Sequence, residues 1–468
     1  MEASKVFIVR NHVLKLLETG ELDEGQQIPP ARELALELDI SFVKVQQGID
    51  ALCRDGILEA HPRQGVFVLP GWQNRILQDN LSVFDSLHRL PWLPGLLKYL
   101  HAEIPDLRIT KKFSRSVLEI KTTHHVLTRH DEYMDLSSIL DECYPDHSDF
   151  FNKIFEPFRI NGRLVGIPFS FSPRVIYCNP KVFKKAGCTV PVHGWTGEEM
   201  LKTLDLLRKV LPAEQVINWH SYPYLWMSFV FRAGGQLFNP GLPDPVCIDS
   251  KETISGLRFF QEIGKRVGDQ SKFDGDVYVK HFLKGEAALF LADRLFTNQI
   301  LSSDFKDWIA IPLPTLPGGK DVTAQATDLI CVRNSCSSFS LIHQFVRLIL
   351  SQEVQDYLAK EKAGIPVRRS SAFKGFDMDD PKEAVLLSEI SKICNEFHLS
   401  TPFPGELVQT GIQRILRDGL DLDKGCKELA SFARTALGIQ NQLPENAPVD
   451  SVFAKSAQIE NNRVIHQK

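Results

Sequence analysis

Residues 158–168 read FRINGRLVGIP, and after six further residues the chain continues VIYCNPKVFKKAG over residues 175–187. Asn161-Gly162 is a dipeptide favoured in two-residue hairpin turns, so we predict two short strands around it. Pro168 then begins a crossing segment that runs into another buried strand. Asn179-Pro180 starts a helix, because asparagine suits the cap and proline the first turn. This stretch therefore predicts strands alternating with helices, the pattern of an α/β domain.

The same alternation begins well before this stretch. Leu81–Phe84 is a plausible opening strand, a helix is expected over residues 93–102, and a second strand is expected near residues 107–110. We therefore place an α/β domain over residues 81–440, after a linker at 71–80. Residues 441–468 are polar and rich in Asn and Gln, which favours a disordered tail.

Residues 158–187 resemble family 1 extracellular solute-binding proteins, and the resemblance as a whole covers roughly residues 81 to 435. Further matching pieces follow in the right order along the chain. These pieces are Trp195–Glu199, Tyr222–Tyr224 with Gly234-Gly235, Phe282–Leu289, Asp307–Pro314, Leu316–Gly319 and Gly364–Arg368. The resemblance implies a two-lobed, type II periplasmic-binding-protein-like domain that closes about a hinge on a ligand held between the lobes. It places hinge strands near Pro168 and Pro312–Pro314. One departure is that residues 124–130, HHVLTRH, stand where the family has a Pro-Asp-Val-Val segment.

Residues 1–70 form a separate unit that ends at the chain-breaking pair Pro70-Gly71. Apolar residues at helical spacing predict a first helix that stops near Gly20, and a second helix is expected over residues 31–38. Ser41 is a good N-cap for a third helix that runs to about Arg54. A hairpin is then expected from residues 57–60 and 66–69, so the unit reads as a winged helix-turn-helix.

This order of elements is similar to the DNA-binding domain of GntR-type regulators over residues 5–69. Matching pieces include Gly20–Leu22, Arg32–Ala35, Asp55–Leu58 and Gly65–Val68. The resemblance implies DNA contacts from Arg32, Ser41, Lys44, Gln46, Gln47 and from the wing-tip pair Arg63 and Gln64. Family members usually carry arginines at the positions held here by Phe42 and Gln46, so base reading by this helix departs from the family pattern.

The charge of the N-terminal unit leaves a second interpretation open. Residues 1–70 hold seven Lys and Arg against eleven Asp and Glu, whereas a DNA-binding domain is expected to present a basic face. The acidic residues gather around Glu21–Glu24 and need not face the groove. The alternative is a winged helix retained for dimerisation or protein contact.

Candidate ligand contacts follow from the solute-binding resemblance, because sugar sites combine aromatic faces with fixed polar side chains. They are Ser86, His88, Arg129, His130, Phe169, Ser170, Ser172, Tyr224, Trp226, Asp293, Arg294 and Asp328. Tyr224 has the stacking position of the maltose-binding branch, while Arg129 and His130 are also compatible with a solvated loop. Asp293 and Arg294 stand where the family commonly has a glycine and a tryptophan. The loss of that tryptophan makes a charged or smaller ligand an alternative, and a simple surface pair of the two residues is another. Trp195 and Trp308 are expected in the core.

Several function classes are disfavoured by the sequence. The charged N-terminal start lacks a signal peptide's apolar run, which predicts a cytoplasmic protein, and no stretch approaches the length of a membrane span. The nine cysteines form no C-x-x-C pair, and nucleophile-elbow, phosphate-loop and H-E-x-x-H motifs are missing. We therefore expect no enzyme, no cofactor and no metal, although the cluster Asp141, Glu142, Asp146, His147 and Asp149 is a conceivable cation site.

The sequence predicts a multidomain α/β protein in which a winged helix precedes a two-lobed sensor domain. This architecture predicts a regulator that binds double-stranded operator DNA. Its effector is expected to be a small molecule, with a sugar favoured, and its working form a homodimer. Two alternatives remain: a cytosolic solute-binding protein without DNA-binding activity, and a catabolic enzyme with a DNA-binding appendage.

Overall fold

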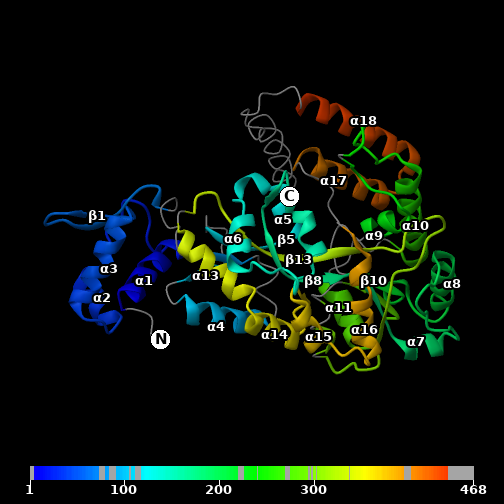
Figure 1. Ribbon diagram of the computed structural model, residues 1–468, viewed down its shortest axis with the longest axis horizontal. Coiled ribbons are helices and arrows are strands. Elements are labelled where there is room, and N and C mark those ends of the chain that lie inside the picture. The colour runs from blue at the N-terminus through cyan, green and yellow to red at the C-terminus, as the bar shows by residue number, and fades with distance from the viewer. Residues whose placement is uncertain are drawn as a thin grey trace, which may run out of the picture.

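The computed structural model describes residues 5–72, 80–83, 91–104, 107–110, 117–219, 226–239, 241–268, 275–292, 296, 299–301, 303–336, 338–394 and 402–440. Figure 1 shows residues 5–72 at one end of the molecule and two β-sheets with their helices in the remainder. None of the described helices is long and apolar enough to cross a membrane.

Residues 5–72 fold as the predicted winged helix. The helices are α1 (Lys5–Thr19), α2 (Ala31–Glu37) and α3 (Phe42–Arg54), and the wing is β1 (Leu58–His61) paired antiparallel with β2 (Gly65–Val68). Fifteen buried apolar residues form a core confined to this unit. The helices α1 and α3 approach closely, since a Cβ on Gly48 would lie 2.7 Å from the side chain of Val9.

The first of two lobes is built on a seven-stranded sheet of order β14-β8-β13-β5-β3-β4, with β15 beside β13. Its strands are β3 (Asn80–Val83), β4 (Arg108–Thr110), β5 (Leu118–Thr122), β8 (Ile167–Pro173), β13 (Thr323–Val332), β14 (Ile365–Pro366) and β15 (Ile393–Cys394). The helices of this lobe are α4 (Leu93–Glu103), α5 (Thr123–Thr128), α6 (Ser137–Cys143), α13 (Phe339–Ile349), α14 (Gln352–Lys360) and α15 (Arg369–Gly375). We call this unit lobe 1.

Lobe 2 is built on a four-stranded sheet of order β10-β11-β9-β12. Its strands are β9 (Val175–Cys178), β10 (Ile217–Trp219), β11 (Leu289–Ala292) and β12 (Ile309–Ile311), and its helices are α7 (Pro180–Lys185), α8 (Gly197–Leu207), α9 (Trp226–Arg232), α10 (Lys251–Val267), α11 (Gly275–Leu283) and α16 (Pro381–Ser388). Two last helices, α17 (Pro402–Asp418) and α18 (Leu422–Gln440), pack against each other, and α18 lies beside α10 (Figure 1).

Short elements complete the lobes. The predicted hairpin at Asn161-Gly162 is present as β6 (Arg159–Ile160) and β7 (Arg163–Leu164), with φ of 50° and 79° at the two turn residues. Positive φ at both central positions is the geometry that Asn-Gly favours. Single turns of 3-10 helix are η3 (His130–Glu132), η4 (Asn152–Ile154), η5 (Glu156–Phe158), η6 (Ala213–Gln215) and η8 (Ile390–Lys392).

Two passages of the chain between the lobes, which we call the first and second crossings, lie at neighbouring points. Only Arg174 separates β8 from β9, and residues 312–322 lead from β12 to β13. The Arg174 amide donates to the Thr323 hydroxyl at 3.1 Å, and that hydroxyl donates to the Arg174 carbonyl at 2.8 Å. The first crossing thus lies at the opposite end of β8 from Pro168, and the second begins at the predicted Pro312.

The segment that departs from the solute-binding family pattern is mostly helical. Residues 124–128 lie in α5, and the strand of this region is β5, Leu118–Thr122. Apolar and charged residues alternate in β5, so the sequence alone presents Glu119 and Lys121 as exposed, although both are buried. The Glu119 carboxylate accepts hydrogen bonds from Tyr133 at 2.7 Å and from Arg333 at 3.0 Å, which is why a buried strand can contain it.

Candidate DNA-binding and ligand-binding sites

The exposed face of α3 holds most of the predicted DNA contacts. Val45, Gly48, Ile49 and Leu52 turn inward, and the outward face is left to Phe42, Val43, Gln46, Gln47 and Asp50. Phe42 and Val43 are 49% and 62% exposed. Ser41 is the N-cap, as predicted, but its side chain makes no capping hydrogen bond.

Polar side chains on α3 are tied to one another. The Gln46 amide donates to Asp50 at 2.9 Å, and the Lys44 ammonium donates to Gln47 at 3.0 Å. These bonds run along the helix, as side chains three or four residues apart allow. They orient both glutamine amides at the surface.

The other predicted DNA contacts lie on separate elements. Arg32 is exposed in the first turn of α2, and Arg63 and Gln64 are exposed in the wing turn. Arg63 has φ of 65°, a conformation uncommon outside glycine, which fixes the tip of the wing. The predicted DNA contacts therefore lie at three places: on α2, on α3 and at the tip of the wing.

In lobe 1 the structure places three of the ligand candidates on one face of the sheet. Asp328 on β13 is opposite Ser170 on β8 in the ladder, and Ala326 is opposite Ser172. Opposed residues share one face of the sheet, so Ser170, Ser172 and Asp328 lie on the same side. All three are buried, and the Ser170 hydroxyl donates to the Ala363 carbonyl at 3.1 Å.

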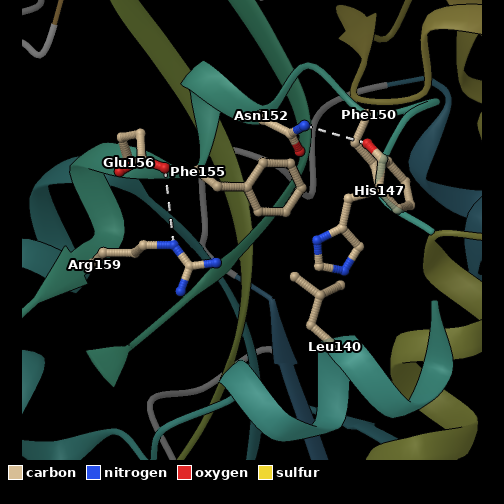
Figure 2. A pocket seen from close by; sticks show the side chains of 7 residues that line it. All are labelled: Leu140, His147, Phe150, Asn152, Phe155, Glu156 and Arg159. Carbon is tan, nitrogen blue, oxygen red and sulfur yellow. Dashed lines mark hydrogen bonds and ion pairs between the residues drawn. The ribbon is translucent and has the colours of Figure 1, made fainter. Parts of the chain in front are cut away.

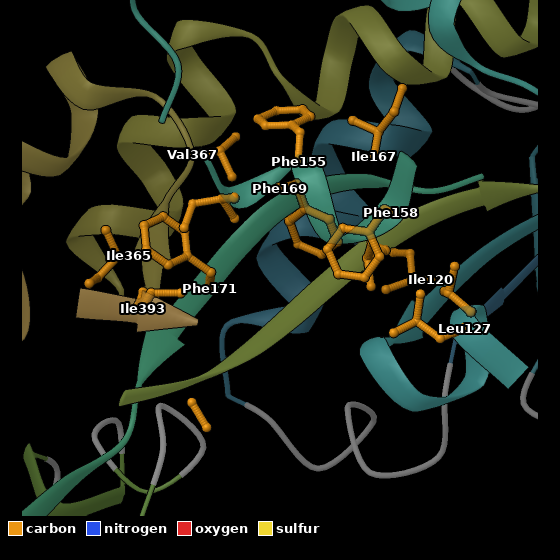
Figure 3. Packing of buried hydrophobic residues seen from close by; sticks show 14 of the residues in the cluster. Ile120, Leu127, Phe155, Phe158, Ile167, Phe169, Phe171, Ile365, Val367 and Ile393 are labelled. Atoms are coloured by element: carbon orange, nitrogen blue, oxygen red, sulfur yellow. The ribbon is translucent and has the colours of Figure 1, made fainter. Parts of the chain in front are cut away.

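Phe169 lies on the other side of that strand. The register shifts there, because Asp328 and Leu329 are opposite Ser170 and Pro168, which leaves Phe169 as a bulge residue. Its fully buried ring lies among Phe155, Phe158 and Val367 in the cluster that Figure 3 shows. Phe169 is thus placed as part of the core of lobe 1.

Three further candidates stand at the starts or ends of helices. Arg129 is exposed and lies 3.9 Å from Glu132, whereas the buried His130 is 2.9 Å from Asp131. Trp226 opens α9 and is 3% exposed, and its indole N–H has no hydrogen-bond partner within the described part of the chain. A buried donor without a partner is costly, so this N–H is an unusual feature of the domain.

Five candidates, Ser86, His88, Tyr224, Asp293 and Arg294, lie outside the described residues. The tail at 441–468 and most of the linker lie outside them too. Trp195 and Trp308 are buried, as expected, and the Trp195 indole donates to the Pro312 carbonyl at 2.9 Å, at the second crossing.

Sequence reasoning missed a cluster of charges beside the second crossing, which we call the crossing cluster: Arg232, Asp321, Glu389 and Lys392. Arg232 donates to Asp321 at 2.7 Å, and the Lys392 ammonium lies 2.9 Å from Asp321 and 2.7 Å from Glu389. Burial acts to raise the pKa of Asp321, but Lys392 and Arg232 outweigh it and lower that pKa. The members come from α9, the crossing and η8, so no local motif could have revealed them.

A surface cavity of about 230 Å³ lies on lobe 1, between α6 and the segment from His147 to Arg159 (Figure 2). Leu140, Phe150 and Phe155 supply apolar walls, and Glu156 pairs with Arg159 at 3.9 Å.

The acidic residues around His147 do not converge on one point that could hold a cation. The Asp149 carboxylate is held by Arg368 and Ser370, and Asp146 accepts a hydrogen bond from Ser148. Among the described residues no group of three potential metal ligands forms.

Two protein families match separate parts of the chain. Residues 8–68 match the bacterial regulatory proteins of the gntR family, and residues 134–356 match the bacterial extracellular solute-binding proteins. The chain joins a gntR-family domain to a solute-binding domain. The first match spans α1 to β2, and the second spans both crossings between the lobes.

Solved structures confirm the fold of the solute-binding domain. The ABC substrate-binding protein Lmo0181 from Listeria monocytogenes, in complex with cycloalternan, is 14% identical with a TM-score of 0.65, over 77% of this chain and 99% of that chain. Maltose-bound MalE3 from T. maritima is 15% identical with a TM-score of 0.63, over 77% and 99% of the chains. UgpB from Mycobacterium tuberculosis, in complex with glycerophosphocholine, is 16% identical with a TM-score of 0.64, over 78% and 99%.

The two matches fit the predicted architecture. A winged helix precedes a two-lobed α/β domain of the periplasmic-binding-protein type, as the sequence indicated. Since solute-binding domains of this fold hold small molecules and gntR-family domains bind DNA, the chain carries the parts of a DNA-binding regulator with a sensor domain.

Proposed function

We propose that this protein is a transcription regulator whose binding to a DNA operator is controlled by a small molecule held between lobe 1 and lobe 2. The observation that carries the proposal is the joining, in one chain, of a gntR-family domain to a solute-binding domain. A ligand shifts the lobes only as far as its affinities for their open and closed arrangements differ. A DNA-binding protein must work where the DNA is, so we place it in the cytoplasm.

A carbohydrate is the favoured ligand class. Two of the similar structures hold cycloalternan and maltose, and a third holds glycerophosphocholine, so the fold accommodates ligands rich in oxygen acceptors. In this chain the indole N–H of Trp226 is a buried donor that suits such an acceptor. Ser170, Ser172 and Asp328 add polar groups on one sheet face, and the other sequence-predicted ligand residues remain part of the proposal.

The domain bounds and the oligomeric state belong to the same proposal. Residues 1–70 bind DNA, 71–80 connect, and 81–440 sense the ligand. One winged helix reads few base pairs, so two copies on a two-fold symmetric site are expected. The homodimer presents both α3 helices and both wings to the operator.

Two measurements on the full chain test this function. A thermal-shift screen against mono- and oligosaccharides should find a ligand that raises Tm, because a ligand that binds only the native state stabilises it. Filter retention of random-sequence duplex DNA at low salt should recover bound duplexes, and the ligand should change their affinity.

The outcomes separate the proposal from its main alternative. A sugar that raises Tm, together with no retention of any duplex, would identify a solute-binding protein without DNA-binding activity. Duplex binding that no effector alters would remove ligand control from the proposal.

A further inference from the structure

The third helix of the gntR-family domain presents apolar side chains to solvent at its N-terminal end. Phe42 and Val43 are the first two residues of α3 and are 49% and 62% exposed. In helix-turn-helix proteins the N-terminal residues of this helix contact base edges in the major groove. The core side of α3 is supplied by Val45, Ile49 and Leu52, so the exposed pair is not needed for packing within the domain.

Two glutamines continue the same face. Gln46 follows Phe42 by four residues and Gln47 follows Val43 by four, so each amide lies one turn beyond an exposed apolar side chain. One N–H of Gln46 donates to Asp50, which leaves the amide oxygen and the second N–H to pair outward. Residues 42–50 include no arginine, the side chain that most often reads guanine.

Both kinds of side chain match the same base pair. An apolar side chain contacts the C5-methyl group of thymine, and a glutamine amide pairs with N6 and N7 of adenine. Building on the proposed DNA binding, we propose that α3 reads A·T pairs in the major groove, with Phe42 and Val43 against thymine methyl groups and Gln46 and Gln47 on adenine edges. Asp50 disfavours a phosphate close to this face and keeps Gln46 turned toward the bases.

Removing single methyl groups from the DNA tests the thymine contacts. Duplexes retained by the full chain from a random-sequence pool are sequenced, and each thymine of the recovered half-site is then replaced in turn by deoxyuridine. A contacted methyl should cost about fourfold in affinity, which corresponds to ~0.8 kcal/mol. For the Phe42→Ala variant, a duplex with thymine and a duplex with deoxyuridine at the position that Phe42 contacts should have the same affinity.

Two more variants complete the test. Phe42→Arg should change the base recovered at that position from thymine to guanine, because arginine pairs with guanine O6 and N7. Leu36→Ala is the matched control, since Leu36 is 85% exposed but lies on α2; it should leave affinity and the deoxyuridine effect unchanged.

Failure of this inference is distinct from failure of the proposed function. If no duplex is retained, DNA binding itself is refuted. Bound duplexes that lack recurrent A·T pairs, or that tolerate deoxyuridine everywhere, would overturn only the A·T reading. If Phe42→Ala keeps its DNA affinity and instead separates dimers into monomers, the exposed face is a protein interface and the inference is wrong.

Discussion

Arg32 shows how much one side chain in the DNA-binding domain is expected to contribute. It lies in the first turn of α2, on a different element from the face of α3. A guanidinium offers paired donors to phosphate or to guanine. We predict that Arg32→Ala weakens binding to a recovered duplex by roughly 1–3 kcal/mol, measured by fluorescence anisotropy at fixed salt.

The control is Arg54→Ala, which removes the same charge from the exposed last turn of α3. A smaller loss for Arg54 than for Arg32 supports a direct contact. Equal losses would mean that only net charge matters and would remove Arg32 from the contacts.

Asp149 links two distant segments of lobe 1 by charge. Its carboxylate accepts from Arg368 at 2.8 Å and from the amide and hydroxyl of Ser370 at 2.9 and 2.7 Å. Burial acts to raise the pKa of Asp149, but these donors outweigh it, so that pKa is lowered on folding. A lowered folded-state pKa gives stability that is present above the unfolded value of about 3.9 and lost as the pH falls below it.

We therefore predict that Asp149→Asn lowers the free energy of unfolding by about 1 kcal/mol at pH 7, since bonds to a charged acceptor exceed those to a neutral one by about that amount. Urea unfolding at pH 7 and at pH 3 measures this, and the difference from wild type should shrink at pH 3. Asp304→Asn, at an exposed aspartate, is the control. A loss that is independent of pH would contradict the charge argument.

Among the elements, β5 depends on one buried ionic contact. Glu119 is 1% exposed and lies 3.0 Å from Arg333 on the segment after β13, with Lys121 at 3.7 Å. Burial, together with the nearby Glu119 charge, raises the pKa of Tyr133, so its hydroxyl stays protonated and donates to that carboxylate. Removing one partner of a buried pair leaves the other charge uncompensated.

Arg333→Met is predicted to lower the free energy of unfolding by ~3 kcal/mol, measured by urea denaturation at pH 7. Arg258→Met is the matched control, because Arg258 and its partner Asp423 are both more than half exposed, and exposed pairs contribute about 0–1 kcal/mol. Equal effects for the two variants would show that Glu119 is compensated by Lys121 and Tyr133 alone.

The same elements show what the sequence could and could not predict. Local signals sufficed for the winged helix and for the hairpin at Asn161-Gly162, where turn chemistry and helical spacing act within a few residues. They failed at β5, because Arg333, one of the partners of the buried Glu119, is more than two hundred residues away in the sequence. The crossing cluster was missed for the same reason. Ser170 and Asp328 were proposed from the family pattern, and only the strand register places them opposite each other.

At the scale of the whole molecule, the proposed function requires that the sensor and the gntR-family domain affect each other. The core of residues 5–72 shares no residue with the cores of the lobes, so within the described part of the chain the two parts are separate packing units. Residues 71–80 are the covalent link. Thermodynamic reciprocity demands that the effector alter operator affinity by the same factor by which the operator alters effector affinity, typically ~5–150-fold.

We predict that a Gly-Ser insertion into the link at residues 71–80 reduces this factor while each separate affinity stays nearly unchanged, because flexible residues transmit little orientation. Titrating operator with and without effector, and effector with and without operator, measures the factor twice. The two values must agree in each variant, which checks the measurement itself. An insertion of equal length into the exposed loop at residues 241–244 of lobe 2 is the control, since it adds the same residues without lengthening the link. If the coupling survives a long flexible insertion in the link, the signal must pass through a dimer interface or a direct contact between domains.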